Sequence, residues 1–256
     1  MPVYANAWFA GCETAEQFAA AAKTTVDAGH DALKLYPFLE MSPFHTSYVD
    51  GQISSAGEEQ GCHIVTAIRS AVGQQVEILI DAHGHNNVPT AVRLANRLHD
   101  ESKISWFEEP VPPESFSALH QVRAPIYVGE RLFTRFDFVP IFANRLADFI
   151  MPDVVWTGGI SELKKISTMA EAHYIPISPH NAQEPGQILA GAHESMTVPN
   201  FYRLEHALSC KASYDRFLQI PLKWDGNGFH LWDRPGLVVD LDMEQVKAMA
   251  HPGWTT

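Results

Sequence analysis

Short β-branched or aromatic runs alternate regularly with longer amphipathic segments along the sequence, and this alternation restricts the possible folds. Strands that alternate with helices in this way pair in parallel, because each helix carries the chain back to the start of the next strand. Eight such runs predict a TIM-like α/β barrel, of the (β/α)8 or (β/α)7β form, with an open doubly wound sheet as the alternative. The expected strands span residues 3–9, 31–36, 76–81, 104–108, 125–130, 147–153, 175–180 and 201–205.

The segments between these runs have the spacing of amphipathic helices. The clearest of them, "TAEQFAAAAKTTVDAG", starts with Thr14 as an N-cap and ends at Gly29, which favours helix termination. We expect helices at residues 13–28, 57–72, 88–100, 114–122, 136–145, 160–173 and 184–196.

Two regions depart from the repeat. Residues 37–56, rich in Pro, Ser and Gly, follow the second expected strand on the side where barrels build active sites. Residues 207–256 do not read as another strand and helix pair, so they predict an extra layer. We therefore expect a barrel domain at residues 1–206 and a C-terminal extension at residues 207–256.

Composition excludes several classes of protein. A formal net charge of −12 and the absence of a basic stripe argue against nucleic-acid binding. No apolar run approaches the length of about 18 residues that would span a membrane. The N-terminus lacks the pattern of a signal peptide, and three cysteines show no CxxC pairing, so a cytoplasmic location is expected.

Acidic residues end three successive expected strands. Asp81, Glu108 and Glu130 would meet at one rim of a barrel, because the carboxyl ends of parallel strands lie together. Such a group needs a cation, and an all-oxygen set favours Mg²⁺ over Zn²⁺. The alternative is that each acid only caps the helix that follows it.

A second pair of polar residues ends the next two expected strands. Asp153 precedes His180 by 27 residues, which is compatible with a carboxylate that orients an imidazole base. The alternative is that His180 forms only a hydrogen bond within its loop. The placement of both residues at strand ends favours the base pair.

With these residues identified, the chain resembles the enolase superfamily, in particular its mandelate racemase subgroup and the acid-sugar dehydratases of the galactonate dehydratase type. The similarity runs from residue 3 to about residue 206, and "DRPGLVVDLD" resembles the C-terminal segment of the family. Single motifs are weak, but their order and spacing together are specific. The matching segments are "LKLYPF", "LIDAHG", "WFEEPVPPE", "VGERL", "MPDVVWTGGISELKKI", "SPHN" and "VPNFYRLEH".

The resemblance implies a metal site and a base. It assigns Mg²⁺ to Asp81, Glu108 and Glu130, with Glu108 preferred because the family uses the first Glu of "EEP". It assigns abstraction of the proton α to the substrate carboxylate to His180, paired with Asp153.

The resemblance also implies the remaining catalytic roles. His83, in a D-x-H-G motif, is the acid that protonates the departing β-hydroxyl, and Glu205 hydrogen-bonds the substrate carboxylate as it becomes an enediolate. Asp81 and His83 should share one face of the strand, because residues i and i+2 point the same way. The implied reaction is the Mg²⁺-dependent dehydration of an aldonate-like sugar acid to a 2-keto-3-deoxy acid.

Four further residues are expected to contact substrate. Lys34 is a charge partner for the substrate carboxylate or for the metal ligands, or else a barrel-interior lysine paired with an acid for stability. The position two residues later, where racemases of the superfamily carry a second lysine, is Tyr36, which disfavours lysine-based racemisation. The three remaining expected substrate contacts are His85, which stands where the motif usually has Arg, Arg131 and Trp156.

Departures from the family pattern keep further functions open. Family members carry an N-terminal capping domain over the barrel mouth, and this chain begins at the first expected strand, so it is also compatible with a catalytically impaired barrel. Only 22 residues separate Glu108 from Glu130, which is shorter than the family pattern and could displace Glu130. A racemase or epimerase of the superfamily, and a zinc hydrolase that uses His83 and His85, also stay open. We expect a small-molecule sugar acid as the partner and a homo-oligomer.

Overall fold

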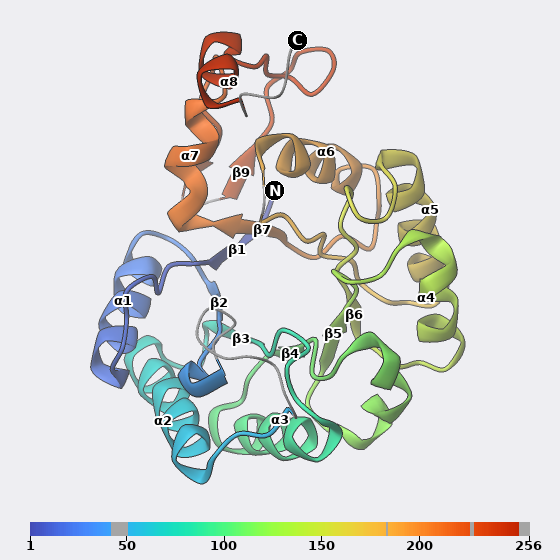
Figure 1. Ribbon diagram of the computed structural model, residues 1–256. Helices are drawn as coiled ribbons and strands as arrows, with labels where there is room; N and C mark the ends of the chain where they lie inside the picture. Colours follow the sequence, from blue (N-terminus) through green and yellow to red (C-terminus); the bar gives the residue numbers. More distant parts are fainter. Residues whose placement is uncertain (42–50, 183, 226–227, 251–256) are drawn as a thin grey trace.

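The computed structural model describes residues 1–41, 51–182, 184–225 and 228–250. Seven parallel strands form one curved sheet in the order β6-β5-β4-β3-β2-β1-β7, with the helices outside it (Figure 1). The predicted α/β barrel architecture is thereby confirmed. The strands are β1 (Val3–Asn6), β2 (Ala32–Leu35), β3 (Glu77–Asp81), β4 (Trp106–Glu108), β5 (Ile126–Val128), β6 (Phe149–Ile150) and β7 (Leu204–Ala207).

The ring closes through residues 175–180, where the seventh of the eight strands was expected. Residues 175–180 form isolated parallel bridges instead of a ladder. Ile177 bridges to Ile150 on one side and to Phe201 on the other, and His180 bridges to Asp153. The prediction of a regular strand here is wrong, because Pro176 and Pro179 lack the N–H groups that a continuous ladder needs. The segment still occupies the gap between β6 and β7, so it completes the barrel.

Helices cover the outside of the sheet in chain order (Figure 1). Thr14 begins the first of them with a capping box, as its sequence predicts. The fourth connection is a 3-10 helix, η2, rather than the predicted α-helix. The helices around the barrel are α1 (Ala15–Asp27), α2 (Ser55–Val72), α3 (Val88–Ser102), η2 (Pro113–Gln121), α4 (Thr134–Ala143), α5 (Ile160–Ala172) and α6 (Pro185–Ser195).

Large side chains fill the interior of the barrel below its carboxyl rim. Trp106 stacks on Tyr127 with ring centroids 4.2 Å apart, and Tyr4 meets Trp106 edge-on at 5.4 Å. Leu79 belongs to the same buried cluster. Because alternate residues of a strand share a face, the residues two positions after Leu79 and Trp106 form the next layer toward the rim. That layer holds the acids of the candidate site.

The C-terminal part of the chain packs on one side of the barrel, next to α6 and the N-terminus (Figure 1). Its apolar side chains join those of β1, α6 and β7 in one buried cluster that includes Val3, Ile188, Leu204, Leu222 and Phe229. The division of the chain at residue 206 stays a prediction. The elements of this part are η3 (Leu208–Cys210), α7 (Lys211–Arg216), β8 (Lys223–Asp225), β9 (Gly228–His230) and α8 (Met243–Met249).

The excursion expected at residues 37–56 lies partly outside the described residues. It starts with a short 3-10 helix, η1 (Leu39–Met41), and the described chain resumes at residue 51 before α2. Across the described part of the chain, every helix is too short or too polar to cross a membrane.

Candidate active site

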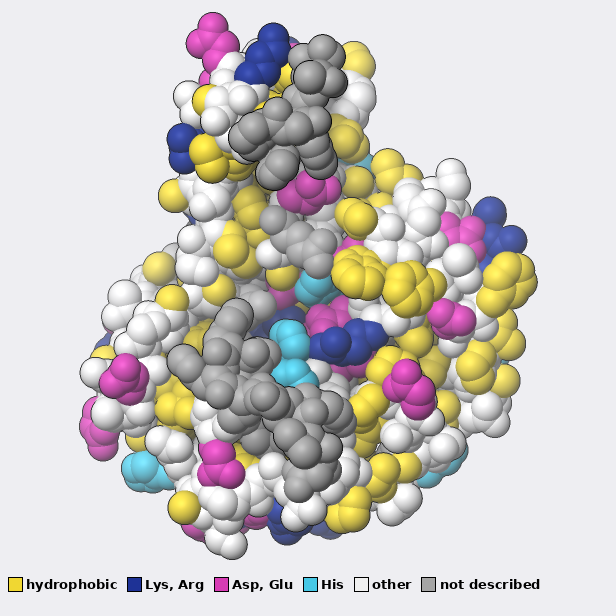
Figure 2. All heavy atoms as spheres, in the orientation of Figure 1, with side chains coloured by type: hydrophobic (Ala, Val, Ile, Leu, Met, Phe, Trp, Pro, Cys, Tyr) yellow, Lys and Arg dark blue, Asp and Glu magenta, His cyan; other side chains and the backbone are white. Residues whose placement is uncertain are grey.

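The carboxyl ends of the strands carry a layer of buried acids, as predicted. Asp81 and Glu108 end β3 and β4 and are direct partners in the register of these strands, and Glu205 lies on β7. Glu108 and Glu205 are fully buried, and Asp81 is nearly so. Acidic, basic and histidine side chains gather at the centre of this face of the barrel (Figure 2).

Lys34 lies between two of these acids. Its Nζ is 2.8 Å from Oε1 of Glu108 and 2.9 Å from Oε1 of Glu205, and the residue is 1% exposed. Burial opposes the charged form of Lys34, but the two carboxylates outweigh it and raise the pKa of the lysine. Burial likewise opposes ionisation of Glu205, yet the charges of Lys34 and His180 lower the pKa of this carboxyl. Lys34 is therefore cationic and Glu205 anionic.

Glu108 has one carboxylate oxygen without a hydrogen-bond partner. Its Oε2 is buried and has no hydrogen-bond partner, while Oε1 binds Lys34. Burial raises the pKa of Glu108, and the charges of Asp81 and Glu130 add to that effect. A buried carboxylate oxygen without a donor is costly, so this point of the rim favours a cation.

Glu130 reaches the same rim although the connection before it is short. It lies two residues beyond β5, after Gly129, whose φ of +138° turns the chain. Oε2 of Glu130 is 3.4 Å from Nε2 of His180, and Oε1 is 3.1 Å from Nη2 of Arg131. The connection contains the 3-10 helix η2, and Glu130 lies among the other acids.

His180 and Asp153 form the expected pair. Nδ1 of His180 lies 2.7 Å from Oδ2 of Asp153, which is fully buried. The side chain of Gln187 on α6 also donates to Oδ2, a partner that no sequence pattern indicated. Burial opposes the charged form of His180, but the hydrogen bond with Asp153 and the nearby Glu205 and Glu130 raise its pKa to about 9.

His83 contacts Asp81, but the two residues do not share a strand face as predicted. β3 ends at Asp81, and His83 lies beyond it with a φ of +56°, in the left-handed region. The N–H of His83 donates to Oδ1 of Asp81 at 2.8 Å, and Nδ1 lies 3.1 Å from Oδ2. A turn closed by the aspartate side chain, rather than a shared strand face, brings the two together. The charge of Asp81 raises the pKa of His83.

The remaining predicted residues lie around the mouth. Nδ1 of His85 is 3.3 Å from the hydroxyl of Tyr36, and the rings of His83 and His85 are 5.4 Å apart. Trp156 is 45% exposed, and its ring centroid lies 5.4 Å from that of Phe133. His85 and Trp156 line the rim at separate places. The guanidinium of Arg131 lies next to Glu109 and Glu130.

As they stand, no three His, Cys, Asp or Glu side chains among the described residues are grouped closely enough to hold a metal ion. Asp81 is engaged by His83 and Glu130 by Arg131, whereas Glu108 keeps a free oxygen. The three acids lie on neighbouring strand ends and act on one another electrostatically.

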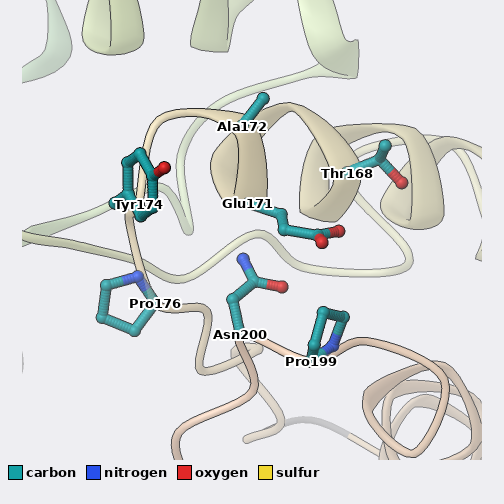
Figure 3. A pocket seen from close by; sticks show the side chains of 7 residues that line it. All are labelled: Thr168, Glu171, Ala172, Tyr174, Pro176, Pro199 and Asn200. Atoms are coloured by element: carbon teal, nitrogen blue, oxygen red, sulfur yellow. The ribbon is translucent and has the colours of Figure 1, made fainter.

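A surface hollow of about 720 Å³ lies at the other end of the barrel (Figure 3). It is formed where α5 ends and leads into residues 175–180, which is the amino-terminal side of the strands. Glu171 and Asn200 point toward each other across it. Because the acids lie at the carboxyl ends of the strands, this hollow is separate from the candidate active site.

The fold and this rim define a class of protein, the TIM-like α/β barrel with acid and base residues at the carboxyl ends of its strands. The family model described as "Enolase C-terminal domain-like" matches residues 17–246. The chain belongs to this family.

Two sequence relatives are named as sugar-acid dehydratases. The chain is 36% identical over 207 residues to a D-gluconate dehydratase of Thermoproteus tenax, which covers 79% of this chain and 40% of the relative. It is 28% identical over 254 residues to a D-gluconate/D-galactonate dehydratase of Picrophilus torridus, which covers 98% of this chain and 63% of the relative. The chain thus spans less than two thirds of the length of either relative.

Solved structures of related proteins are also similar to this chain. A mandelate racemase/muconate lactonizing enzyme-like protein from Rubrobacter xylanophilus is 34% identical, with a TM-score of 0.86 over 99% of this chain and 69% of its own. A member of the enolase superfamily from Salmonella Typhimurium is 25% identical, with a TM-score of 0.89 over 96% of this chain and 67% of its own.

Proposed function

We propose that this barrel carries the chemistry of a Mg²⁺-dependent dehydratase that converts an aldonate-like sugar acid to a 2-keto-3-deoxy acid. The observation that carries the proposal is the His180 pair. Nδ1 of His180 is held by Asp153, and its Nε2 faces Glu130 and Glu205 at the rim, 3.4 and 4.0 Å away. The relatives named as sugar-acid dehydratases support the same chemistry.

The donor chemistry of the rim fits Mg²⁺, although the three carboxylates would have to draw closer together around the ion. The unpartnered Oε2 of Glu108 offers a buried oxygen, and Asp81 and Glu130 add the carboxylates that a hard cation prefers. We propose that these three residues hold the ion. When bound, it would supply positive charge to the substrate carboxylate, whose oxygens receive the electrons of the broken C–H bond.

His180 is the proposed base. Its Nε2 takes the proton on the carbon next to the carboxylate, and Asp153 holds Nδ1–H so that Nε2 is the free nitrogen. The base must be neutral to act, whereas Asp153, Glu205 and Glu130 together raise the pKa of His180. A cation bound by Glu130 would oppose this effect, because positive charge nearby disfavours the imidazolium and so favours the neutral base.

His83 is the proposed acid for the second half of the reaction. Hydroxide leaves poorly, so a proton from His83 converts the β-hydroxyl to water as the C–O bond breaks. The α-carbon has lost a proton and the β-carbon a hydroxyl, which leaves an enol that tautomerises to the 2-keto-3-deoxy acid. His83 lies at the rim beside Asp81, with its Nδ1 3.1 Å from Oδ2, which places an imidazole next to the proposed metal site.

Lys34 and Glu205 form the end of the site that would face the substrate carboxylate. Lys34 brings a fixed positive charge close to the position of the developing negative charge. Glu205 is ionised and accepts from Lys34 and from the N–H of Asn181. A carboxylate in this state orients the lysine, and it needs a proton before it can donate to an enediolate.

A screen of sugar acids with Mg²⁺ tests the proposal. We expect the protein to produce a 2-keto acid from at least one of them, and His180→Asn to abolish the product because the base is lost. Chromatography of the 2-keto acid as its semicarbazone gives the measurement.

His63→Asn is the matched control, because His63 is exposed on α2, one of the helices on the outside of the barrel. It should retain the activity of the unchanged protein. The proposal is wrong if no sugar acid yields product, or if His180→Asn remains as active as the control.

A further inference from the structure

Glu109 is a buried acid to which the proposed reaction gives no role. It directly follows β4 and the proposed ligand Glu108, is fully buried, and has a φ of +42°. Positive φ is uncommon for residues other than Gly and persists only where surrounding contacts hold the chain. The contacts of Glu109 therefore indicate why the chain adopts this conformation.

Glu109 links three strand ends. Its backbone carbonyl accepts from the N–H of Gly84, after β3, at 2.7 Å. Its Oε1 accepts from the N–H of Gly129, after β5, at 2.8 Å. One residue at the end of β4 thus fixes the chain directly before Glu130 and directly after His83.

Arg131 connects the same segments from the other side. Its Nη2 donates to the carbonyl of His83 at 2.7 Å and lies 3.1 Å from Oε1 of Glu130. Its Nε is 3.6 Å from Oε2 of Glu109. The guanidinium packs against Gly84, where an added Cβ would meet Nε at 3.2 Å. The close approach of Arg131 therefore depends on a residue without a side chain.

We propose that Glu109 and Arg131 are positioning residues that together set the geometry of Glu130 and His83. The roles of Glu130 and His83 themselves rest on the proposed function. The geometry gives Arg131 a task other than the substrate contact predicted from sequence, since its guanidinium is directed at two acids and a backbone carbonyl. Residues that orient metal ligands typically change metal affinity about 10- to 100-fold when they are replaced.

Calorimetric titration with Mg²⁺ is the first test. Glu109→Ala and Arg131→Gln should each weaken Mg²⁺ binding about 10- to 100-fold. The double variant should be little weaker than the worse single variant, because both changes break one network. Glu109→Gln should recover most of the affinity, since its amide oxygen can still accept from the N–H of Gly129.

Arg135→Gln is the matched control. The side chain of Arg135 is 34% exposed, close to the 35% of Arg131, and it is also paired with an acid, Glu162. It should bind Mg²⁺ like the unchanged protein. Loss of affinity in this control equal to that of Arg131→Gln would overturn the inference, as would additive effects in the double variant. A rise in KM with unchanged Mg²⁺ affinity would identify Arg131 as a substrate contact instead.

A readout without metal separates this inference from the proposed function. In ¹⁵N-histidine-labelled protein free of Mg²⁺, the ring resonances of His83, assigned with His83→Gln, should move in Glu109→Ala and Arg131→Gln but not in Arg135→Gln. Unchanged His83 resonances in the first two variants would contradict the positioning role. If the unchanged protein binds no Mg²⁺ or forms no 2-keto acid, the proposed function fails, and the His83 resonances alone decide the inference.

Discussion

At the scale of single residues, Lys34 explains how the crowded acids of the rim coexist. Its ammonium lies 2.8 Å from a carboxylate oxygen of Glu108 and 2.9 Å from one of Glu205. One buried cation therefore offsets part of the negative charge of two carboxylates on different strands. The sequence left open whether Lys34 meets acids or substrate, and the structure shows the contacts with acids. Asp81 and Glu130 take their partners from His83, His180 and Arg131 at the mouth.

Replacement of Asp81 tests the metal assignment residue by residue. Asp81→Ala should weaken Mg²⁺ binding by at least about 100-fold, because the loss of a metal ligand lowers affinity more than the loss of a residue that only orients a ligand. His85→Arg should keep the affinity of the unchanged protein, since the ring of His85 lies against the hydroxyl of Tyr36 and supplies no proposed ligand. Isothermal titration calorimetry measures the Mg²⁺ affinity of both variants. Tight Mg²⁺ binding by Asp81→Ala would show that Asp81 is not a metal ligand.

At the scale of elements, the turn after β5 is the feature that delivers Glu130 to the rim. Gly129 has a φ of +138°, and an added Cβ would meet the backbone N of Met151 at 3.1 Å and the ring of Phe138 at 3.0 Å. Both backbone conformation and space therefore require Gly here. The same turn lets the N–H of Gly129 reach Glu109.

Gly129→Ala should destabilise the fold more than the same substitution at another glycine with positive φ. Gly73, at the end of α2, has a φ of +79° and ψ of −177°, and nothing lies within 4 Å of an added Cβ. Gly73→Ala therefore reports backbone strain alone. We expect Gly129→Ala to lower the free energy of unfolding in urea by about 1–3 kcal/mol more than Gly73→Ala, because of the added overlap. Equal losses in the two variants would show that the turn can relax.

At the scale of the whole molecule, the C-terminal segment and the barrel share an apolar core. Phe229 is 1% exposed in the cluster that joins β1, α6 and β7. Burial of this cluster links the extension to the strand that carries Glu205. The two parts should therefore unfold together.

Phe229→Ala should lower the free energy of unfolding by about 3–5 kcal/mol, because it leaves a cavity between the extension and the barrel. Phe136→Ala is the control, since Phe136 is 67% exposed, and it should change stability little. Calorimetry of the unchanged protein should show one transition. Two separate transitions, or equal stability of both variants, would show that the extension contributes nothing to the barrel.

The order of residues along the chain was enough to predict the barrel and the polar residues at its carboxyl rim. Alternation of strands and helices requires parallel pairing, and parallel pairing brings the carboxyl ends of all strands to one side. Asp81, Glu108 and the pair of Asp153 with His180 were therefore placed correctly at that side from the sequence. These inferences depend only on the order of elements and on residues at strand ends.

The remaining features could not be predicted from the residue order, because they depend on contacts between distant residues and on the backbone beyond the strands. The left-handed turn at His83 follows from hydrogen bonds with Asp81 that no strand periodicity encodes. The bridges of residues 175–180 replace a strand because two prolines interrupt its ladder. The network of Glu109 and Arg131 exists only once three strand ends have come together.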